Sequence, residues 1–224
     1  GFYIKPVNRS FGNEAPGQVC LVENRPRTLD ARGIYEWRGT SSGNITGDQR
    51  NAQRISQKVQ RTLLGFDPAK TVCFYDRVRG EYYCVCGGTA AVQNVNADAW
   101  YIYTELPATA MIAYKDELYF ADSSGWLRHF SRDYRSDNGA DIDAYWESGS
   151  LSFDKSFMRK YSPELWVGLK PESLSALTAG IETESSQRIT KTVTEPGGDS
   201  DVKPRMHRLK LKASKFTYYK LTLV

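Results

Sequence analysis

The chain has 224 residues, of which 40% are hydrophobic and 12% aromatic, and its formal net charge is +4. This composition excludes a disordered or low-complexity chain, and the mild charge excludes a nucleic-acid-binding domain defined by charge alone. The sequence contains no run of about 18 apolar residues, so it predicts no membrane-spanning helix. Gly1 stands in place of an initiator Met, so we expect that upstream sequence belongs to the same protein.

The N-terminal part predicts irregular strands followed by one helix. Residues 1–47 are interrupted by glycines and prolines, which is typical of short strands and loops. We predict a helix over residues 49–63, because apolar residues recur there at helical spacing, with Asp48 as its N-cap and Gly65 at its end. One face of this helix holds Ala52, Ile55, Val59 and Leu63, and the opposite face holds Arg50, Arg54, Lys58 and Arg61.

After the helix the hydrophobic period changes to two, which predicts antiparallel strands joined by short turns. Four strands are expected over residues 71–76, 81–87, 90–95 and 99–104, and three more over 111–114, 118–121 and 126–130. Four-strand units in series are typical of β-propeller blades. Fewer than three blades are expected before residue 132, and that number is too small to close a ring.

A turn at Asp137-Asn138-Gly139 predicts a boundary between two domains, residues 1–132 and residues 133–224. The first is expected to be a propeller-blade-like β domain with the helix at 49–63. The second contains six or seven alternating segments in about 80 residues, a size and pattern that suit a small antiparallel β-sandwich. The predicted fold class is therefore mainly β, with partial propeller-like blades and one amphipathic helix, followed by the sandwich.

Several sequence runs, taken in order, resemble one known family. They are Glu81-Tyr82-Tyr83, Asn96 to Tyr101, Glu117 to Gly125, Asp137 to Arg159-Lys160, Leu165 to Pro171 and Lys215 to Leu221. Together they resemble β-propeller proteins of tailed-bacteriophage particles, above all the packaged-DNA stabilisation and tail-accessory proteins of short-tailed phages. The resemblance covers roughly residues 30–224 and corresponds to the C-terminal portion of such proteins. It implies a structural part of the virion, without catalytic residues or a cofactor.

The basic side chains are the candidate binding residues. Arg208, Lys210 and Lys212 alternate with the apolar residues Leu209, Leu211 and Ala213, so a strand would present the basic residues on one face. This face and the stripe formed by Arg50, Arg54, Lys58 and Arg61 can contact DNA phosphates or an acidic subunit. The alternatives are a solvated helix face and an edge strand protected by lysines.

Other patterns give weaker indications of chemistry. Asp133, Asp137, Asp141 and Asp143 form an acidic stretch, but their spacing does not match an EF-hand loop. The cysteines Cys20, Cys73, Cys84 and Cys86 lack metal-site spacing and are expected to be buried and reduced, with a cross-strand disulfide involving Cys73 left open. No nucleophile motif or phosphate-binding loop is present. We therefore expect no metal and no cofactor.

The leading hypothesis is a virion structural protein, made in the host cytoplasm, that binds other tail or connector subunits and forms a homo-oligomer in the particle. Contact with DNA is an open addition to it. The alternative from another class is a carbohydrate-binding module for host-surface recognition, which the tryptophans and tyrosines favour. A glycoside-degrading enzyme is the third hypothesis, although no pair of carboxylates is singled out by the sequence.

Overall fold

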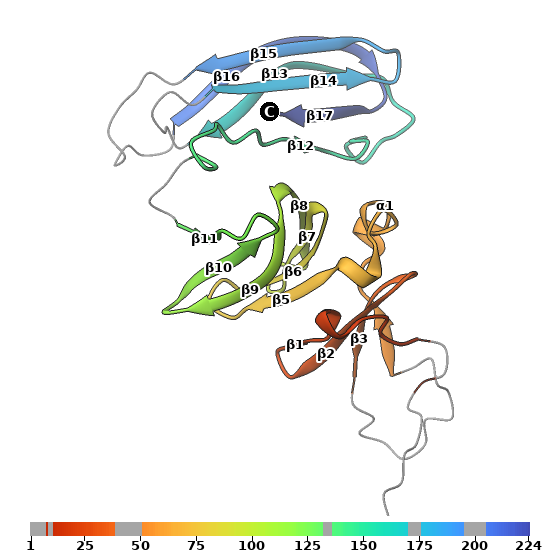
Figure 1. Cartoon of the computed structure of the whole chain (residues 1–224). Helices are drawn as coiled ribbons and strands as arrows, with labels where there is room; N and C mark the ends of the chain where they lie inside the picture. Colours follow the sequence, from red (N-terminus) through yellow and green to blue (C-terminus); the bar gives the residue numbers. More distant parts are fainter. Residues whose placement is uncertain (1–7, 9–10, 39–50, 132–135, 170–175, 195–204) are drawn as a thin grey trace, which may run out of the picture. The chain divides into compact units, whose positions relative to one another are not determined.

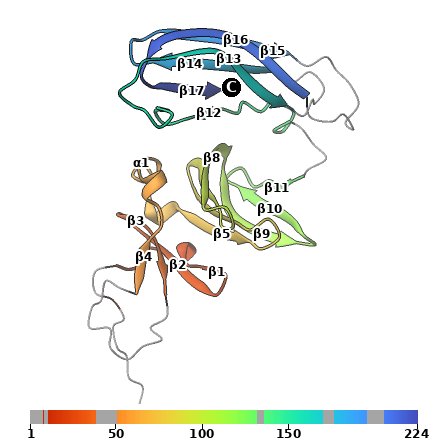
Figure 2. The same cartoon turned by 180° about the vertical axis from the view of Figure 1, so that it is seen from behind.

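The structure is a computed structural model that describes residues 8, 11–38, 51–131, 136–169, 176–194 and 205–224. The chain divides into two compact units, Gly1–Asp133 and Tyr134–Val224, one residue away from the predicted boundary. Antiparallel sheets form both units (Figure 1, Figure 2). The mainly β class predicted from the sequence is therefore confirmed.

Three antiparallel sheets follow one another along the first unit, and within each sheet successive strands pair. The first sheet contains β1 (Cys20–Val22), β2 (Arg25–Asp30), β3 (Gly33–Trp37) and β4 (Ala52–Arg54). The second contains β5 (Val72–Asp76), β6 (Glu81–Cys86), β7 (Gly88–Asn94) and β8 (Ala99–Leu106). The third contains β9 (Ala108–Tyr114), β10 (Glu117–Asp122) and β11 (Leu127–Phe130). The two predicted meanders are confirmed, and the first sheet is more regular than expected.

The predicted helix over residues 49–63 is wrong in its first half. Residues 49 and 50 lie outside the described residues, and Ala52–Arg54 form β4, which pairs with β3. Between Asn51 and Leu63, helical structure is limited to a 3-10 helix, Gln57–Val59, and to α1 (Gln60–Leu63). Pairing with β3 provides backbone hydrogen bonds to β4 and still buries its first side chain. Tertiary pairing therefore overrides the helical spacing of the apolar residues.

Two further 3-10 helices, Pro16–Gln18 and Pro68–Lys70, complete the helical structure of the described residues. Within this part of the chain, no helix has the length and apolar character needed to cross a membrane.

The strands β6 and β7 of the second sheet are buried on both faces, whereas most of β8 is exposed. Successive residues of β6 point to opposite sides, as the strand period requires. Tyr82 and Cys84 join a hydrophobic cluster shared with the first sheet, whereas Tyr83 and Val85 join a cluster shared with the third. The first strand of this sheet, β5, packs beside both β1 and β9. The three sheets of the first unit therefore stack in chain order.

The second unit contains two sheets around one core. Its four-stranded sheet has the order β12 (Trp146–Glu147), β17 (Tyr219–Leu223), β14 (Ala176–Thr183) and β15 (Arg188–Thr194). Its two-stranded sheet pairs β13 (Lys160–Leu169) with β16 (Arg205–Phe216). Ile181 from the first sheet and Leu211 and Phe216 from the second belong to the same buried cluster. The two sheets therefore share one hydrophobic core.

Candidate functional site

The basic residues expected on one helix do not form a helical stripe. Arg54 lies half-buried on β4, and Arg61 is exposed on α1. Lys58, in the 3-10 helix, donates from Nζ to the backbone oxygen of Asp98 at 2.8 Å and lies 3.1 Å from its Oδ2. Arg50 lies outside the described residues. The three described residues are therefore placed on three short elements, and one of them is already engaged by an acidic partner.

The predicted alternation on β16 is confirmed. Arg208, Lys210 and Lys212 are exposed, whereas the apolar residues between and after them are buried. On the neighbouring strand β13, Trp166 lies opposite Arg208 and Glu164 lies opposite Lys210. The Arg208 guanidinium forms an ion pair with Glu164 and lies 5.9 Å from the centre of the Trp166 ring. The outer face of this strand pair is therefore both basic and aromatic.

Glu164 makes this face less basic than the sequence of β16 alone indicates. Its carboxylate is the hydrogen-bond acceptor of Arg208, and this contact, opposed by desolvation, lowers the pKa of Glu164. The sheet has only two strands, so β16 resembles the lysine-protected edge strand of the alternative interpretation. Contact with DNA at this face stays a prediction.

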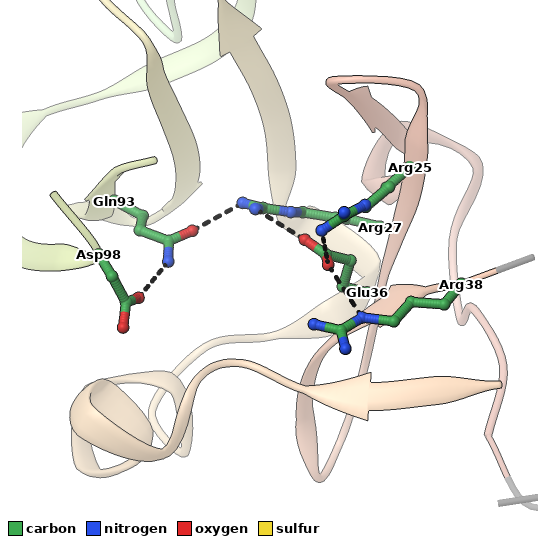
Figure 3. A network of polar contacts seen from close by, with 6 residues as sticks. All are labelled: Arg25, Arg27, Glu36, Arg38, Gln93 and Asp98. Atoms are coloured by element: carbon green, nitrogen blue, oxygen red, sulfur yellow. Dashed lines mark hydrogen bonds and ion pairs between the residues drawn. The ribbon is translucent and has the colours of Figure 1, made fainter. Parts of the chain in front are cut away.

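A buried polar network joins the first two sheets, and Figure 3 shows its six residues. Arg27 on β2 is only 3% exposed, and its Nη2 lies 3.1 Å from Glu36 Oε2 on β3. Its Nη1 donates to Gln93 Oε1 on β7 at 2.7 Å. Gln93 in turn donates from Nε2 to Asp98 Oδ1 at 2.9 Å. The Arg27 guanidinium also lies 4.9 Å from the centre of the Tyr82 ring.

Two exposed arginines approach the same carboxylate from the first sheet. Arg25 Nη1 lies 3.1 Å and Arg38 Nε 3.6 Å from Glu36 Oε1 (Figure 3). Three guanidinium groups therefore meet at the Glu36 carboxylate. Because Glu36 and Arg27 are both buried, we infer that the network fixes how the first sheet packs on the second, rather than binding a ligand.

A buried aspartate recurs at the end of one strand in each sheet. Asp30, Asp76 and Asp122 end β2, β5 and β10, and successive members are 46 residues apart. In each case Oδ1 accepts a hydrogen bond from the backbone N–H two residues later, at 2.8–2.9 Å. In each case Oδ2 also pairs with an arginine, namely Arg32, Arg79 and Arg128 at 3.1, 2.8 and 2.8 Å.

This aspartate turn recurs at a constant spacing, although Asp76 ends the first strand of its sheet and Asp30 and Asp122 end the second. A period of about 40–50 residues is typical of propeller blades, in which each repeat forms one sheet. Sequence reasoning missed the repeat, because each copy contributes only an aspartate and a following glycine, Gly33, Gly80 or Gly125, in an otherwise different segment. The equal spacing of the three aspartates, each followed by a glycine three or four residues later, is the signal that could have revealed it.

The third of these aspartates predicts a pH dependence of stability. Hydrogen bonds from the backbone of Trp126 and from Arg128 hold the pKa of Asp122 below its ordinary value of 3.8. A carboxyl group with a lowered folded-state pKa adds stability above its unfolded-state pKa, and this stability is lost as the pH falls through the folded-state value. We expect the melting temperature of Asp122→Asn to depend less on pH between about pH 5 and pH 2 than that of the wild type.

The control is Asp116→Asn, which changes an exposed aspartate in the neighbouring turn and should leave the wild-type pH profile unchanged. Circular-dichroism melting curves measure all three proteins. If the profiles of Asp122→Asn and the wild type have the same slope, the carboxylate does not have the role that its contacts indicate.

The acidic stretch and the cysteines do not assemble a metal site in the described part of the chain. Asp137, Asp141 and Asp143 are exposed, and Asp133 lies outside the described residues. No group of three or more His, Cys, Asp or Glu among the described residues is arranged to hold a metal ion. All four cysteines are free, and Cys73 and Cys84 lie directly opposite each other on β5 and β6. Cys84 is buried, but the predicted burial of the other three is wrong, because they are half-buried.

Burial makes at least one of these thiols a poor nucleophile. It raises the pKa of Cys20 to about 11, so this thiol stays protonated at neutral pH. Comparison with known proteins adds no assignment at this point, since neither a protein-family profile nor a curated protein sequence matches the chain.

Proposed function

We propose that the first unit consists of three consecutive β-propeller blades and that the second unit is a small β-sandwich. The 46-residue repeat of the aspartate turn and the stacking of the three sheets support the first assignment. The single core shared by two antiparallel sheets supports the second. Within the described residues, three blade-like sheets are too few to close a ring.

On this architecture the chain acts as a structural component of a phage virion, in the tail or the connector, and works by binding other proteins rather than by catalysis. The observation that carries this proposal is the repeated stack of blade-like sheets, which agrees with the ordered sequence motifs that resemble phage propeller proteins. Its partners are other phage structural proteins and further copies of the chain, and its location is the assembled particle.

Particle purification tests this proposal directly. Phage particles are released from cells that carry the gene and banded in a density gradient, and each fraction is probed with an antibody against the chain. We expect the chain to sediment with the capsid band and to remain there after a high-salt wash. Detection only in the unassembled lysate would contradict the virion role.

The same purified chain distinguishes the carbohydrate-binding alternative. The specific observation in its favour is Trp166, whose side chain is 56% exposed beside Arg208. A signal on a glycan array that disappears in Trp166→Ala, together with absence from particles, would favour that alternative. A blank array together with particle association supports the structural role.

A further inference from the structure

The third sheet of the first unit has one packed face and one open face. Leu118 and Phe120 of its central strand β10 point into the cluster shared with the second sheet. Tyr119 and Ala121, which alternate with them on β10, point to the opposite side of the sheet, away from this cluster. Their cross-strand neighbours on β9 and β11 point to the same side as they do. The outer face of this sheet is formed by Ala110, Ile112, Tyr114, Tyr119, Ala121, Leu127 and His129, with Glu117 at its edge opposite Tyr114, and we refer to it as the β10 face.

The β10 face is apolar and exposed. Ile112, Tyr114 and Leu127 have 58%, 59% and 68% of their surface exposed. Tyr119 lies at the centre, with its ring stacked 5.4 Å from His129 and edge-on to Tyr114 at 6.5 Å. Contiguous apolar patches on a sheet are typical of interaction surfaces. The strands β6 and β7 of the second sheet show the contrast, since both of their faces are covered by neighbouring sheets.

We infer that the β10 face binds the β10 face of a second copy of this chain, so that two third sheets pack face to face. The side chains of the face would remove about 500 Å² from solvent on each copy, given the typical size of such residues. Two copies together would bury about 1,000 Å², which reaches the lower limit for a specific interface.

Charge also favours an identical partner. The only acidic side chain on this side of β10 is Glu117, whose Oε2 lies 3.9 Å from Arg79 Nη2. At the rim, Lys115 lies 5.3 Å from the centre of the Tyr114 ring. The centre of the face carries no carboxylate, lysine or arginine, so two copies meet without repulsion between like charges.

The shape of the face is self-complementary under a two-fold rotation. One cross-strand row holds Ile112, Tyr119 and His129, and the next row, one pleat away, holds the smaller Ala110 and Ala121 with Leu127. Consider a two-fold axis that lies in the plane of the interface, midway between these two rows and parallel to them. Rotation about this axis places the bulky row of each copy on the smaller row of the other. Ile112 then contacts Ala110 of the second copy, and Tyr119 contacts Ala121.

This inference rests on the proposed structural role and deepens it, because it names the surface and the partner. The test is sedimentation velocity of the full chain over a concentration series. We expect the wild type to dimerise with a dissociation constant of about 10 µM, since interfaces of this size are weak. Ile112→Asp should raise this constant at least about tenfold, because it buries a carboxylate in the dimer alone.

Val78→Asp is the matched control. It introduces the same charge at a side chain of similar exposure, 57%, in the β5–β6 turn, and it should dimerise like the wild type. Ala110→Lys should also be monomeric on its own, and mixing it with Ile112→Asp should restore a heterodimer, because the two charges would meet across the proposed axis.

A monomeric wild type would overturn the inference, and so would equal effects of Ile112→Asp and Val78→Asp. A further outcome is that Ile112→Asp is monomeric but does not associate with Ala110→Lys when the two variants are mixed. This outcome would overturn the proposed two-fold geometry and with it the assignment of the partner surface. These outcomes are separate from the particle experiment, since a chain that sediments with virions but is monomeric in isolation contradicts only the dimer.

Discussion

We expect Glu36→Ala to lower the free energy of unfolding of the first unit by about 3 kcal/mol, as is typical when a buried ion pair loses one partner. Glu36 is 6% exposed and forms an ion pair with Arg27, which is 3% exposed. Without it, Arg27 keeps its hydrogen bond to Gln93 and its contact with the Tyr82 ring, but its charge is no longer balanced. The measurement is a urea titration in which unfolding is followed by hydrogen exchange at the backbone amides of β6. These amides lie in the core of the first unit, so they report the unfolding of that unit and not of the second.

Lys58→Ala is the control at the exposed end of the same network. Lys58 and Asp98 have side chains that are 61% and 70% exposed, so their ion pair is screened by solvent. Its removal should cost less than about 1 kcal/mol. Equal losses in Lys58→Ala and Glu36→Ala would show that burial does not decide the strength of these contacts.

A paired replacement separates charge from packing. In Arg27→Met with Glu36→Leu, both buried charges are replaced by apolar side chains of similar length. We expect this double variant to be more stable than Glu36→Ala, because it leaves no uncompensated charge between the sheets. A double variant less stable than Glu36→Ala would indicate that the hydrogen bond from Arg27 to Gln93, and not charge balance, holds the two sheets together.

The strands of this protein could be predicted because their period is visible within a few residues. In β6 the apolar side chains alternate between two faces, and in β16 they alternate with charged ones. β6 pairs with both of its neighbours in sequence, whereas β16 pairs with the distant strand β13. Short turns therefore determine the partners of β6, but not the partner of β16. Local information was therefore sufficient for the two meanders of the first unit and for the exposed basic face of β16.

The helix prediction failed because the decisive contact is not local. Ala52, Val59 and Leu63 are buried, as the helical interpretation requires, but Ala52 is buried on a strand that pairs with β3. The pairing of β3 with β4 spans a segment outside the described residues, and the sequence offers no short turn that would indicate it. Burial was predicted correctly at these positions, and the backbone conformation was not.

The polar network could not be predicted for a similar reason. Arg27 and Gln93 are separated by 66 positions, and each has an ordinary polar context in sequence. Only the stacking of the first two sheets brings them together. The aspartate turns could be predicted only in part. The spacing of the aspartates can be read from the sequence, but their burial and their arginine partners depend on the fold.

One of these turns gives the second large expected effect, since Gly33→Ala should destabilise the first unit by about 2–4 kcal/mol. Gly33 has φ +136°, a conformation that alanine adopts only with strain, and an added Cβ would lie 2.4 Å from Ser56 Oγ. Ser56 is fully buried and its Oγ accepts a hydrogen bond from the Ile34 N–H at 3.0 Å. Rotation of Ser56 to avoid the new methyl group would leave that N–H buried without its acceptor.

Gly87→Ala isolates the contribution of the backbone. Gly87 also has a positive φ, +57°, but an added Cβ would meet nothing within 4 Å. Its substitution should cost only about 1 kcal/mol, the strain of a left-handed non-glycine residue. Gly33→Ala combined with Ser56→Ala removes the closest clash but keeps the approaches of the new Cβ to Gln60 Oε1 at 3.0 Å and Arg54 Nε at 3.2 Å. It also leaves the Ile34 N–H without its acceptor, so we expect little recovery. If that double variant returns to the stability of Gly87→Ala, steric contact alone limits this turn and the hydrogen bond from Ile34 contributes little.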